Sequence, residues 1–319
     1  MPDGESRLPQ LGNRLFLTDG GQETTLIFRE GWELPCFAAI TLMQSSEGVA
    51  ALQKYYREYL QLASSVQAGF ILEGATWRAS HDWGVKLGLG PTDLQRLNRD
   101  AIALLQELRS ERAESDFPIV LSGCIGPRGD GYRPDRQQTP EQAAAYHQIQ
   151  VETLAAAGAE LVTAMTMNTV AEALGIALAA RRIGIPAVIS FTVETDGRLP
   201  EGVNLQQAIE RIDQATDGSV SYFMINCAHP SHFLEELRHG SGWQHRIRGI
   251  RANSSTLSHA ELDEATELDE GDPRQLGEAF VQLREHLPEL TVLGGCCGTD
   301  LRHVSEIARA CAPLFHPRC

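Results

Sequence analysis

The stretch Thr291-Val292-Leu293-Gly294-Gly295-Cys296-Cys297-Gly298-Thr299 joins a short apolar run to a pair of cysteines flanked by glycines. A short apolar run bounded by glycine is typical of a buried strand in a parallel sheet. Two adjacent cysteines after two glycines are a poor choice for packing, but they suit a place where two thiolates reach one metal ion. The stretch therefore predicts a buried strand that ends at a metal site.

Similar apolar runs recur along the whole chain, and helical patterns separate them. The predicted strands are 15–18, 69–72, 119–122, 161–164, 187–191, 222–226, 248–251 and 291–293. Helices are predicted over 50–68, 93–108, from 139 onward, 170–182, 205–215, 232–238, 272–286 and 300–311. Strands that alternate with helices predict parallel β/α units, and eight such units are the number that closes a (β/α)8 TIM barrel.

No composition shift or long linker divides the chain, so a single barrel domain over residues 1–319 is predicted. A length of 319 residues lies within the usual range of such a barrel. The polar residues 1–13 are expected to form a flexible lead-in. The polar segments 130–139 and 256–271 are expected to be loops, the second of them over one end of the barrel.

Composition and charge exclude several classes of partner. A net charge of −15 argues against nucleic acid, because phosphate binding requires a basic surface. No apolar run reaches the roughly 18 residues that a membrane span needs, and the N-terminus has no apolar signal core. We therefore expect a cytoplasmic protein that binds neither nucleic acid nor membrane. Oligomeric state leaves no signature in the sequence.

The seven cysteines are expected to be reduced thiols. An odd number of cysteines without a signal peptide argues against a disulfide framework. Four of them show no partner pattern and are expected to be structural or incidental: Cys36, Cys124, Cys311 and Cys319.

The predicted barrel brings the other three cysteines together. Active sites of such barrels lie at the carboxyl ends of the strands, where Cys227 follows the sixth strand and Cys296 and Cys297 follow the eighth. Three thiolates suit Zn²⁺ and leave one of its four positions open, as in catalytic sites. A substrate thiol bound there is deprotonated at neutral pH and can attack a methyl group on a positively charged sulfur or nitrogen. We therefore expect a zinc site for a small-molecule thiol and a methyl donor, with no further catalytic residue.

Two alternatives to an open catalytic site remain. Adjacent cysteines also occur as small buried hydrophobic residues. In Cys227-Ala228-His229, the histidine could supply a fourth ligand and close the site, although neighbouring side chains at a strand end tend to diverge.

Charged and aromatic residues are expected at the same end of the barrel. Asp19, after the first strand, either holds a substrate ammonium group or caps its own loop. Further carboxylates near strand ends are Glu23, Glu73 and Glu194. The rings of Trp77, Trp83 and Tyr132 either contact an onium methyl group by a cation–π interaction or pack the loops.

These residues resemble the homocysteine S-methyltransferase family over nearly the whole chain, from about Leu15 to Ala310. The resemblance is carried by Asp19-Gly20-Gly21, Ser122-Gly123-Cys124-Ile125-Gly126-Pro127, Tyr146-His147, Ile189-Ser190-Phe191-Thr192, Asn226-Cys227 and Gly294-Gly295-Cys296-Cys297-Gly298-Thr299. It implies a zinc-dependent S-methyltransferase that forms methionine from homocysteine. The implied donor is a sulfonium, S-methylmethionine or S-adenosylmethionine, or a betaine-type compound.

The resemblance also implies roles for individual residues. Cys227, Cys296 and Cys297 match the zinc ligands of the family. Asp19 matches the residue that contacts the amino group of homocysteine. Asn226 and the backbone of Gly294 and Gly295 match the lining of the amino-acid pocket.

Two positions depart from the family pattern. The family usually has a Glu-Thr pair after the fourth strand, and its Glu helps to bind the ammonium group of homocysteine; this chain has Met165-Thr166. After the second strand, Glu73 adds a carboxylate that the family pattern lacks. Either Glu73 compensates and binds the substrate, or the acceptor is a different thiol or a selenol. A zinc-binding homologue without activity is the remaining alternative.

Overall fold

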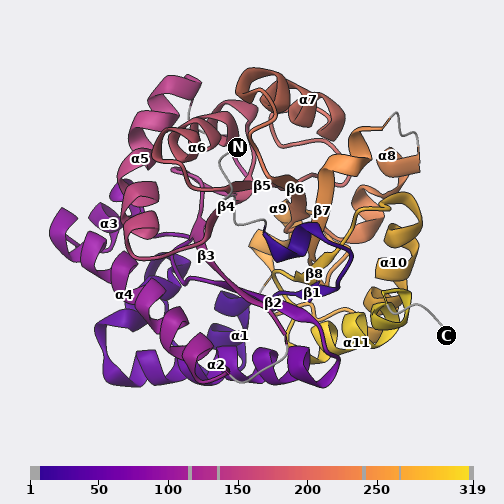
Figure 1. Ribbon diagram of the computed structural model, residues 1–319, viewed down its shortest axis with the longest axis horizontal. Helices are drawn as coiled ribbons and strands as arrows, with labels where there is room; N and C mark the ends of the chain where they lie inside the picture. Colours follow the sequence, from indigo (N-terminus) through magenta and orange to yellow (C-terminus); the bar gives the residue numbers. More distant parts are fainter. Residues whose placement is uncertain (1–7, 114–116, 135–136, 239–241, 266, 316–319) are drawn as a thin grey trace, which may run out of the picture.

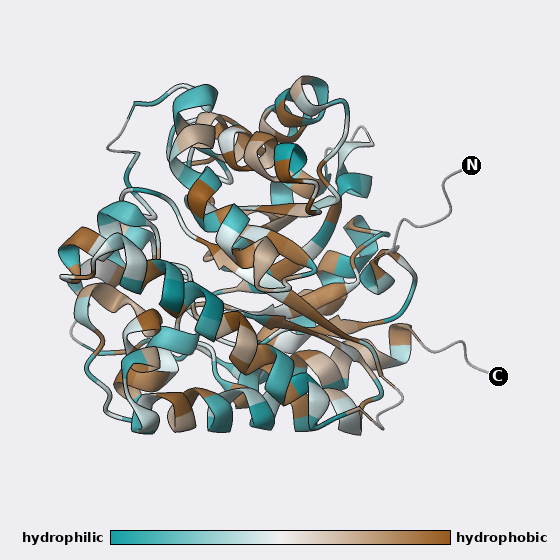
Figure 2. Ribbon diagram, turned by 60° about the vertical axis from the view of Figure 1, so that its left-hand side comes forward, coloured by the Kyte–Doolittle hydropathy of each residue, from teal (hydrophilic) through white to brown (hydrophobic). Residues whose placement is uncertain are grey.

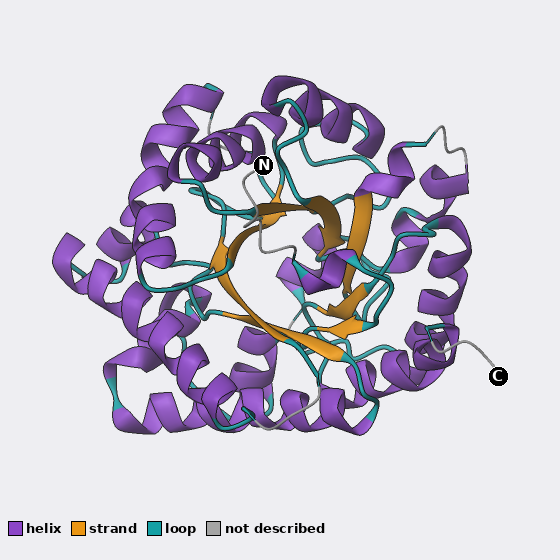
Figure 3. Ribbon diagram, viewed as in Figure 1, coloured by secondary structure: helices purple, strands orange, loops and turns teal. Residues whose placement is uncertain are grey.

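Eight parallel strands close into a barrel in their order along the chain, and helices surround them (Figures 1 and 3). This computed structural model describes residues 8–113, 117–134, 137–238, 242–265 and 267–315. The strands are β1 (Phe16–Leu17), β2 (Gly69–Glu73), β3 (Ile119–Ile125), β4 (Leu161–Met167), β5 (Ala187–Phe191), β6 (Tyr222–Asn226), β7 (Ile247–Ala252) and β8 (Val292–Gly295). The predicted (β/α)8 barrel is confirmed, with every predicted strand in its place.

The described helices are α1 (Gln22–Phe28), α2 (Ser46–Ser65), α3 (His81–Lys86), α4 (Pro91–Ser110), α5 (Pro140–Ala156), α6 (Val170–Ile183), α7 (Leu205–Thr216), α8 (Leu234–Arg238), α9 (His259–Glu264), α10 (Pro273–His286) and α11 (Leu301–Cys311). Most of them form the outer ring of the barrel, whereas the short helices α1 and α9 lie at the carboxyl ends of the strands (Figure 1). Local sequence explains where several begin. In α5, for example, Thr139 and Gln142 form a reciprocal capping box and Pro140 takes the first helical position. None of the described helices is both long and apolar enough to cross a lipid bilayer.

The core has two parts because the strands are buried on both faces. One part lies between the barrel and the helices, where Phe191, Phe223 and Phe280 are fully buried. The other fills the barrel near the amino ends of the strands and includes Phe16 and Tyr222. Figure 2 shows apolar strands inside a ring of helices whose outer faces are largely hydrophilic. The polar carboxyl end of the barrel is thereby left for a site.

The N-terminal segment corrects one expectation. Residues 1–7 lie outside the described part of the chain, but residues 8–11 are packed rather than a flexible lead-in. Leu8 joins the core inside the barrel and is 6% exposed. The backbone oxygen of Gln10 accepts a hydrogen bond from Thr291 Oγ1 at 2.9 Å. The segment therefore covers the amino end of the barrel, opposite the predicted site.

The barrel–helix packing leads to a stability prediction. Truncating the fully buried Phe280 of α10 to alanine should lower the free energy of unfolding by about 3–5 kcal/mol, because it removes a large side chain and leaves a cavity. The matched control is Ile149→Ala in α5, whose side chain is 55% exposed and whose loss should change stability by less than about 0.5 kcal/mol. Urea unfolding measures both; equal effects would contradict the described packing.

Candidate metal centre

Three thiols from two strand ends converge at the carboxyl end of the barrel. The Sγ atoms of Cys227, Cys296 and Cys297 all lie within 4.8 Å of one another. The Sγ atoms of Cys227 and Cys297 are 3.9 Å apart. Tetrahedral zinc with a Zn–S bond of about 2.3 Å requires sulfur atoms about 3.8 Å apart. Both the donor set and the spacing fit a zinc ion, as the sequence predicted.

Glycines allow the backbone that carries Cys296 and Cys297 to approach its neighbours. A Cβ atom on Gly294 would collide with Thr18 Oγ1, and one on Gly295 would collide with Thr299 Oγ1. The backbone N–H of Gly295 donates to the backbone oxygen of Asp19 at 2.9 Å. The backbone N–H of Cys296 donates to the backbone oxygen of Ala252 at 2.7 Å. The two glycines therefore place the cysteine pair tightly between β7 and β1.

Two residues at the site adopt left-handed backbone conformations. Cys227 has φ of 52° and Thr166 has φ of 63°. Positive φ is rare for a β-branched residue such as threonine, and it persists only where the surroundings enforce it. Asn226 supplies that constraint: its side chain accepts a hydrogen bond from the backbone N–H of Thr166 at 2.9 Å and donates one to Thr166 Oγ1 at 2.8 Å. Asn226 thus holds the ends of β4 and β6 together.

Each sulfur atom has a polar neighbour that can donate a hydrogen bond. Thr166 Oγ1 lies 3.8 Å from the sulfur of Cys227, and Asn226 Nδ2 lies 3.8 Å from that of Cys296. The hydroxyl of Tyr132 lies 3.7 Å from the sulfur of Cys297. Such outer contacts orient metal ligands and stabilise their negative charge.

The three thiols also change one another's acidity. Hydrogen bonds from Cys296 and Cys297 hold the pKa of Cys227 well below its usual value. The same hydrogen bonding to Cys227 raises the pKa of Cys296 to about 12 and raises the pKa of Cys297.

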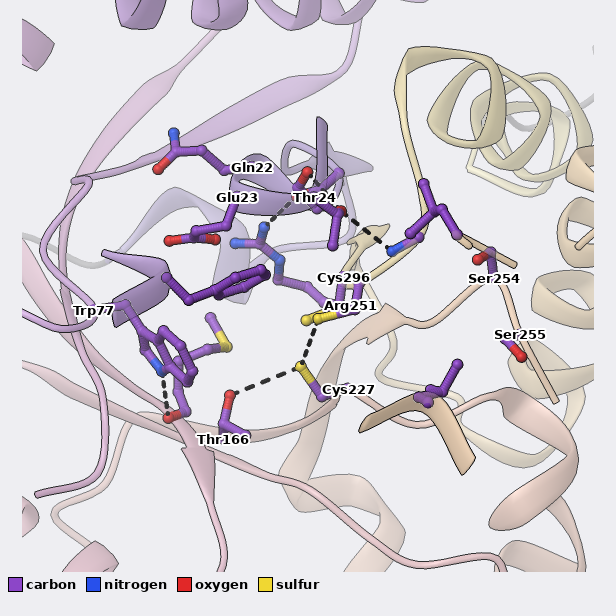
Figure 4. Close-up of a pocket in the computed structure, with 18 of the residues that line it drawn as sticks. Gln22, Glu23, Thr24, Trp77, Thr166, Cys227, Arg251, Ser254, Ser255 and Cys296 are labelled. Atoms are coloured by element: carbon purple, nitrogen blue, oxygen red, sulfur yellow. Dashed lines mark hydrogen bonds between the residues drawn. The ribbon is translucent and has the colours of Figure 1, made fainter. Parts of the chain in front are cut away.

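The thiols line a cavity of about 400 Å³ (Figure 4). Its wall includes the predicted residues Asp19, Glu23 and Glu73, and also Met165 in the position where the family pattern has Glu. Apolar contributions come from Trp77, Tyr132, Phe28, Phe37, Leu262 and Leu268. Such a volume is typical of a site for small molecules.

A buried arginine in the wall of this cavity, which the sequence analysis missed, joins the two carboxylates. Arg251 Nη2 lies 2.5 Å from Asp19 Oδ1, and Nη1 lies 3.8 Å from Glu73 Oε2. Asp19 also accepts from Tyr55 at 3.2 Å, and Glu73 accepts from Thr163 at 2.9 Å. The available signal was a charged residue at the carboxyl end of a predicted buried strand.

Burial and charge act in opposite directions on these carboxyl groups. Burial raises the pKa of Asp19 and of Glu73, and the guanidinium of Arg251 opposes the rise in both. Burial raises the pKa of Glu23 to about 7, and a hydrogen bond from the backbone and the charge of Arg78 oppose this rise only in part.

A histidine on the loop after β7 is a second feature that the sequence analysis missed. The ring of His259, at the start of α9, stacks on Tyr132 with the ring centroids 4.1 Å apart. Its Nε2 lies 2.6 Å from the backbone oxygen of Cys227, and its Nδ1 lies 3.3 Å from Glu194. This contact joins the loops after β3 and β7 over the thiols. The segment 256–271 was expected to be a loop, but part of it is helical.

Other predicted residues lie beside the cavity rather than in its wall. The described residues that line the cavity do not include Asn226, Gly294, Gly295, Glu194 or Trp83. A direct contact of the first three with a substrate stays a prediction. His229 is not part of the thiol group, and its Nδ1 lies 2.8 Å from Ser231 Oγ instead.

The four cysteines expected to be incidental have different surroundings. Cys36 is exposed and Cys311 is buried. Cys124 is buried and contributes to the cavity wall. Cys319 lies outside the described residues.

The chain is similar to several known proteins. The family model described as homocysteine S-methyltransferase matches residues 16–311. The homocysteine S-methyltransferase of Escherichia coli (strain K12) is 26% identical over 312 residues, which are 92% of this chain and 94% of that protein. The methionine synthase of Mycobacterium tuberculosis is 26% identical over 97% of this chain, and the match spans only 26% of that larger protein.

Solved structures show the same architecture. The metallated form of the homocysteine methyltransferase MmuM from Escherichia coli has a TM-score of 0.74 at 20% identity, covering 93% of this chain and 96% of that one. Its oxidized form has a TM-score of 0.75 at 21% identity, covering 95% and 98%. At these identities the likeness supports the barrel fold.

The thiol geometry predicts the effect of removing one ligand. Cys297→Ala should weaken Zn²⁺ binding by more than about 100-fold, because loss of an outer-shell partner alone typically costs 10–100-fold. Cys36→Ala, which removes an exposed thiol outside the group, should leave Zn²⁺ affinity unchanged. Competition with a chromogenic chelator measures the affinities, and circular dichroism checks the fold. Wild-type affinity in folded Cys297→Ala protein would show that the group is not the metal centre.

Proposed function

The chain belongs to the homocysteine S-methyltransferase family, and from that membership we propose that it is an enzyme that transfers a methyl group to the thiol of homocysteine, forming methionine. The observation that carries the proposal is the convergence of Cys227, Cys296 and Cys297 at the wall of a cavity of about 400 Å³. Two small molecules that react with each other need such an enclosed meeting place at the metal.

We take the metal to be zinc, held by Cys227, Cys296 and Cys297. The sulfur atoms of Cys227 and Cys297 are 3.9 Å apart, close to the spacing of about 3.8 Å that tetrahedral zinc requires. The all-thiolate donor set also supports this choice. When bound, zinc provides a Lewis-acidic position at which the acceptor thiol loses its proton near neutral pH. Thr166, Asn226 and Tyr132 support the ligand sulfurs from outside.

The reaction itself needs no general base from the protein. The acceptor sulfur forms a bond to the methyl carbon of the donor while the bond from that carbon to the positively charged donor atom breaks. The bonding electron pair stays on the donor atom, which becomes neutral, and the thiol proton has already left to solvent. Positive charge disappears in the transition state, so a site that excludes water favours it. Trp77, Met165 and Leu262 supply apolar wall for this purpose.

The donor is proposed to be a sulfonium such as S-methylmethionine. Trp77 and Tyr132 offer ring faces that attract an onium methyl group, and Glu23 offers a nearby carboxyl group. S-adenosylmethionine and betaine-type donors carry the same kind of methyl group. The three reduced thiols suit the cytoplasm, where we place the protein.

The proposal predicts methionine formation by zinc-loaded protein. Incubation with homocysteine and, separately, S-methylmethionine, S-adenosylmethionine or betaine should give methionine from at least one donor, detected by mass spectrometry with a deuterated methyl group. Cys36→Ala should retain this turnover, and Cys297→Ala should lose it because the acceptor thiol has no metal to bind.

A panel of other thiols and selenols identifies a different acceptor if homocysteine is inert. Failure of every donor and acceptor with zinc bound would contradict the proposed activity and leave a zinc-binding protein that is not an enzyme.

A further inference from the structure

Two unmatched polar groups lie side by side in the cavity wall. The guanidinium of Arg251 donates through Nε to the backbone oxygen of Gly295 at 3.0 Å, and through Nη2 to the carboxylate of Asp19 and the backbone oxygen of Gly20. Among the described residues, no group accepts a hydrogen bond from Arg251 Nη1. Glu73 Oε2 is buried, and it too has no hydrogen-bond partner in the part of the chain that the structure describes. The two atoms are 3.8 Å apart, too far for a hydrogen bond of their own. One unused donor therefore stands beside one unused acceptor.

The bonds on the rest of each side chain hold this pair in place. Arg251 is held through Nε and Nη2 by the backbone of β8, by the loop after β1 and by Asp19. Glu73 is held through Oε1 by Thr163 of β4. Both side chains are over nine-tenths buried, so a missing partner is costly for each. Positions this well defined are typical of a recognition site rather than of a solvated surface pair.

The pair is close to the thiols. Arg251 pairs with Gly294 across β7 and β8, two residues before Cys296. Arg251 and Cys296 line the same cavity (Figure 4). A small molecule with its sulfur at the three-cysteine site can therefore place a polar end at Arg251 and Glu73.

We propose that Arg251 is a specificity-determining residue that binds the carboxylate of an amino-acid thiol through Nη1, while Glu73 Oε2 accepts a hydrogen bond from its ammonium group. The inference rests on the proposed function and deepens it by assigning the acceptor class to this pair. A zwitterion presents an anionic acceptor and a cationic donor on adjacent atoms, which matches the unused donor and acceptor in the wall. Glu73 then supplies the carboxylate that is absent at Met165.

Charge balance supports a zwitterion over a simple acid. With both carboxylates ionised, Asp19, Glu73 and Arg251 together carry one negative charge. A thiol with a carboxylate but no ammonium group would add a second negative charge to a buried site. A thiol with an ammonium group alone would leave Arg251 Nη1 unmatched. Sites built to hydrogen-bond a polar group discriminate strongly against analogues that lack it.

The test compares three thiols that differ only in these groups: homocysteine, 3-aminopropane-1-thiol without the carboxylate, and 4-mercaptobutyrate without the ammonium group. Calorimetric titration of the zinc-loaded protein measures binding independently of turnover. Homocysteine should bind at least about 10-fold more tightly than either analogue, because each lacks one charged hydrogen bond. Equal affinity of homocysteine and 3-aminopropane-1-thiol would overturn the role of Arg251, as expected if water alone fills the gap.

Variants assign the discrimination to the two residues separately. Arg251→Lys keeps the charge that Asp19 needs but not the planar fork, so the preference for homocysteine over 3-aminopropane-1-thiol should fall to within about 3-fold. Glu73→Gln should instead reduce the preference over 4-mercaptobutyrate and leave the carboxylate preference intact. Arg248→Lys, the same change at the other end of β7, should alter neither ratio.

Each contrary result has a distinct meaning. Unchanged ratios in Arg251→Lys would overturn the inference, and so would ratios that change equally in Arg248→Lys. Should Arg251→Lys not fold, the wild-type ratios and Glu73→Gln still decide the question. If none of the three thiols binds zinc-loaded protein, both the proposed function and this inference fail. Methionine formation with equal binding of homocysteine and its analogues would instead keep the function and reject the role of Arg251.

Discussion

The seam at which β8 closes the barrel against β1 is the contact on which the site depends. Gly294 and Gly295 let β8 lie against Thr18 and Thr299 at a distance that no side chain would permit. The backbone bond from Gly295 to Asp19 then brings the first and last strands together at their carboxyl ends. Because Cys296 and Cys297 follow directly, closure of the barrel also positions two of the three thiols.

Arg251 ties this seam to the cavity. Its guanidinium contacts the backbone of Gly295 in β8, Gly20 after β1 and the carboxylate of Asp19. Burying an arginine is expensive unless its charge is paired and its N–H groups are bonded. Asp19 and the two carbonyls meet most of that requirement inside the protein, and the part left open faces the substrate cavity. The same residue therefore stabilises strand closure and leaves binding capacity at the site.

The parts of this architecture that sequence could predict depend on local pattern. The strand runs, the long helices and the three cysteines were predicted because apolar periodicity and ligand chemistry are visible in neighbouring residues. Helices α1, α3 and α9 are too short for periodicity to show. The packed segment from Leu8 to Leu11 looked polar because its burial comes from the barrel mouth that it covers. Arg251 and His259 were missed because their partners, Asp19 and Cys227, lie far away in sequence.

The departure at Met165 shows how a site can change while its chemistry stays possible. Met165 leaves its position on β4 without a carboxylate that could anchor an ammonium group. Glu73 supplies a carboxylate from β2, and Thr163, two residues before Met165 on β4, holds it in position. The carboxylate therefore lies two strands away from Met165 but lines the same cavity. A second carboxylate beside Asp19 in a buried site is tolerable because Arg251 lies against both. Glu73 and Arg251 thus act as a pair: the arginine makes a second buried carboxylate tolerable, and its Nη1 still has N–H groups to offer to a ligand.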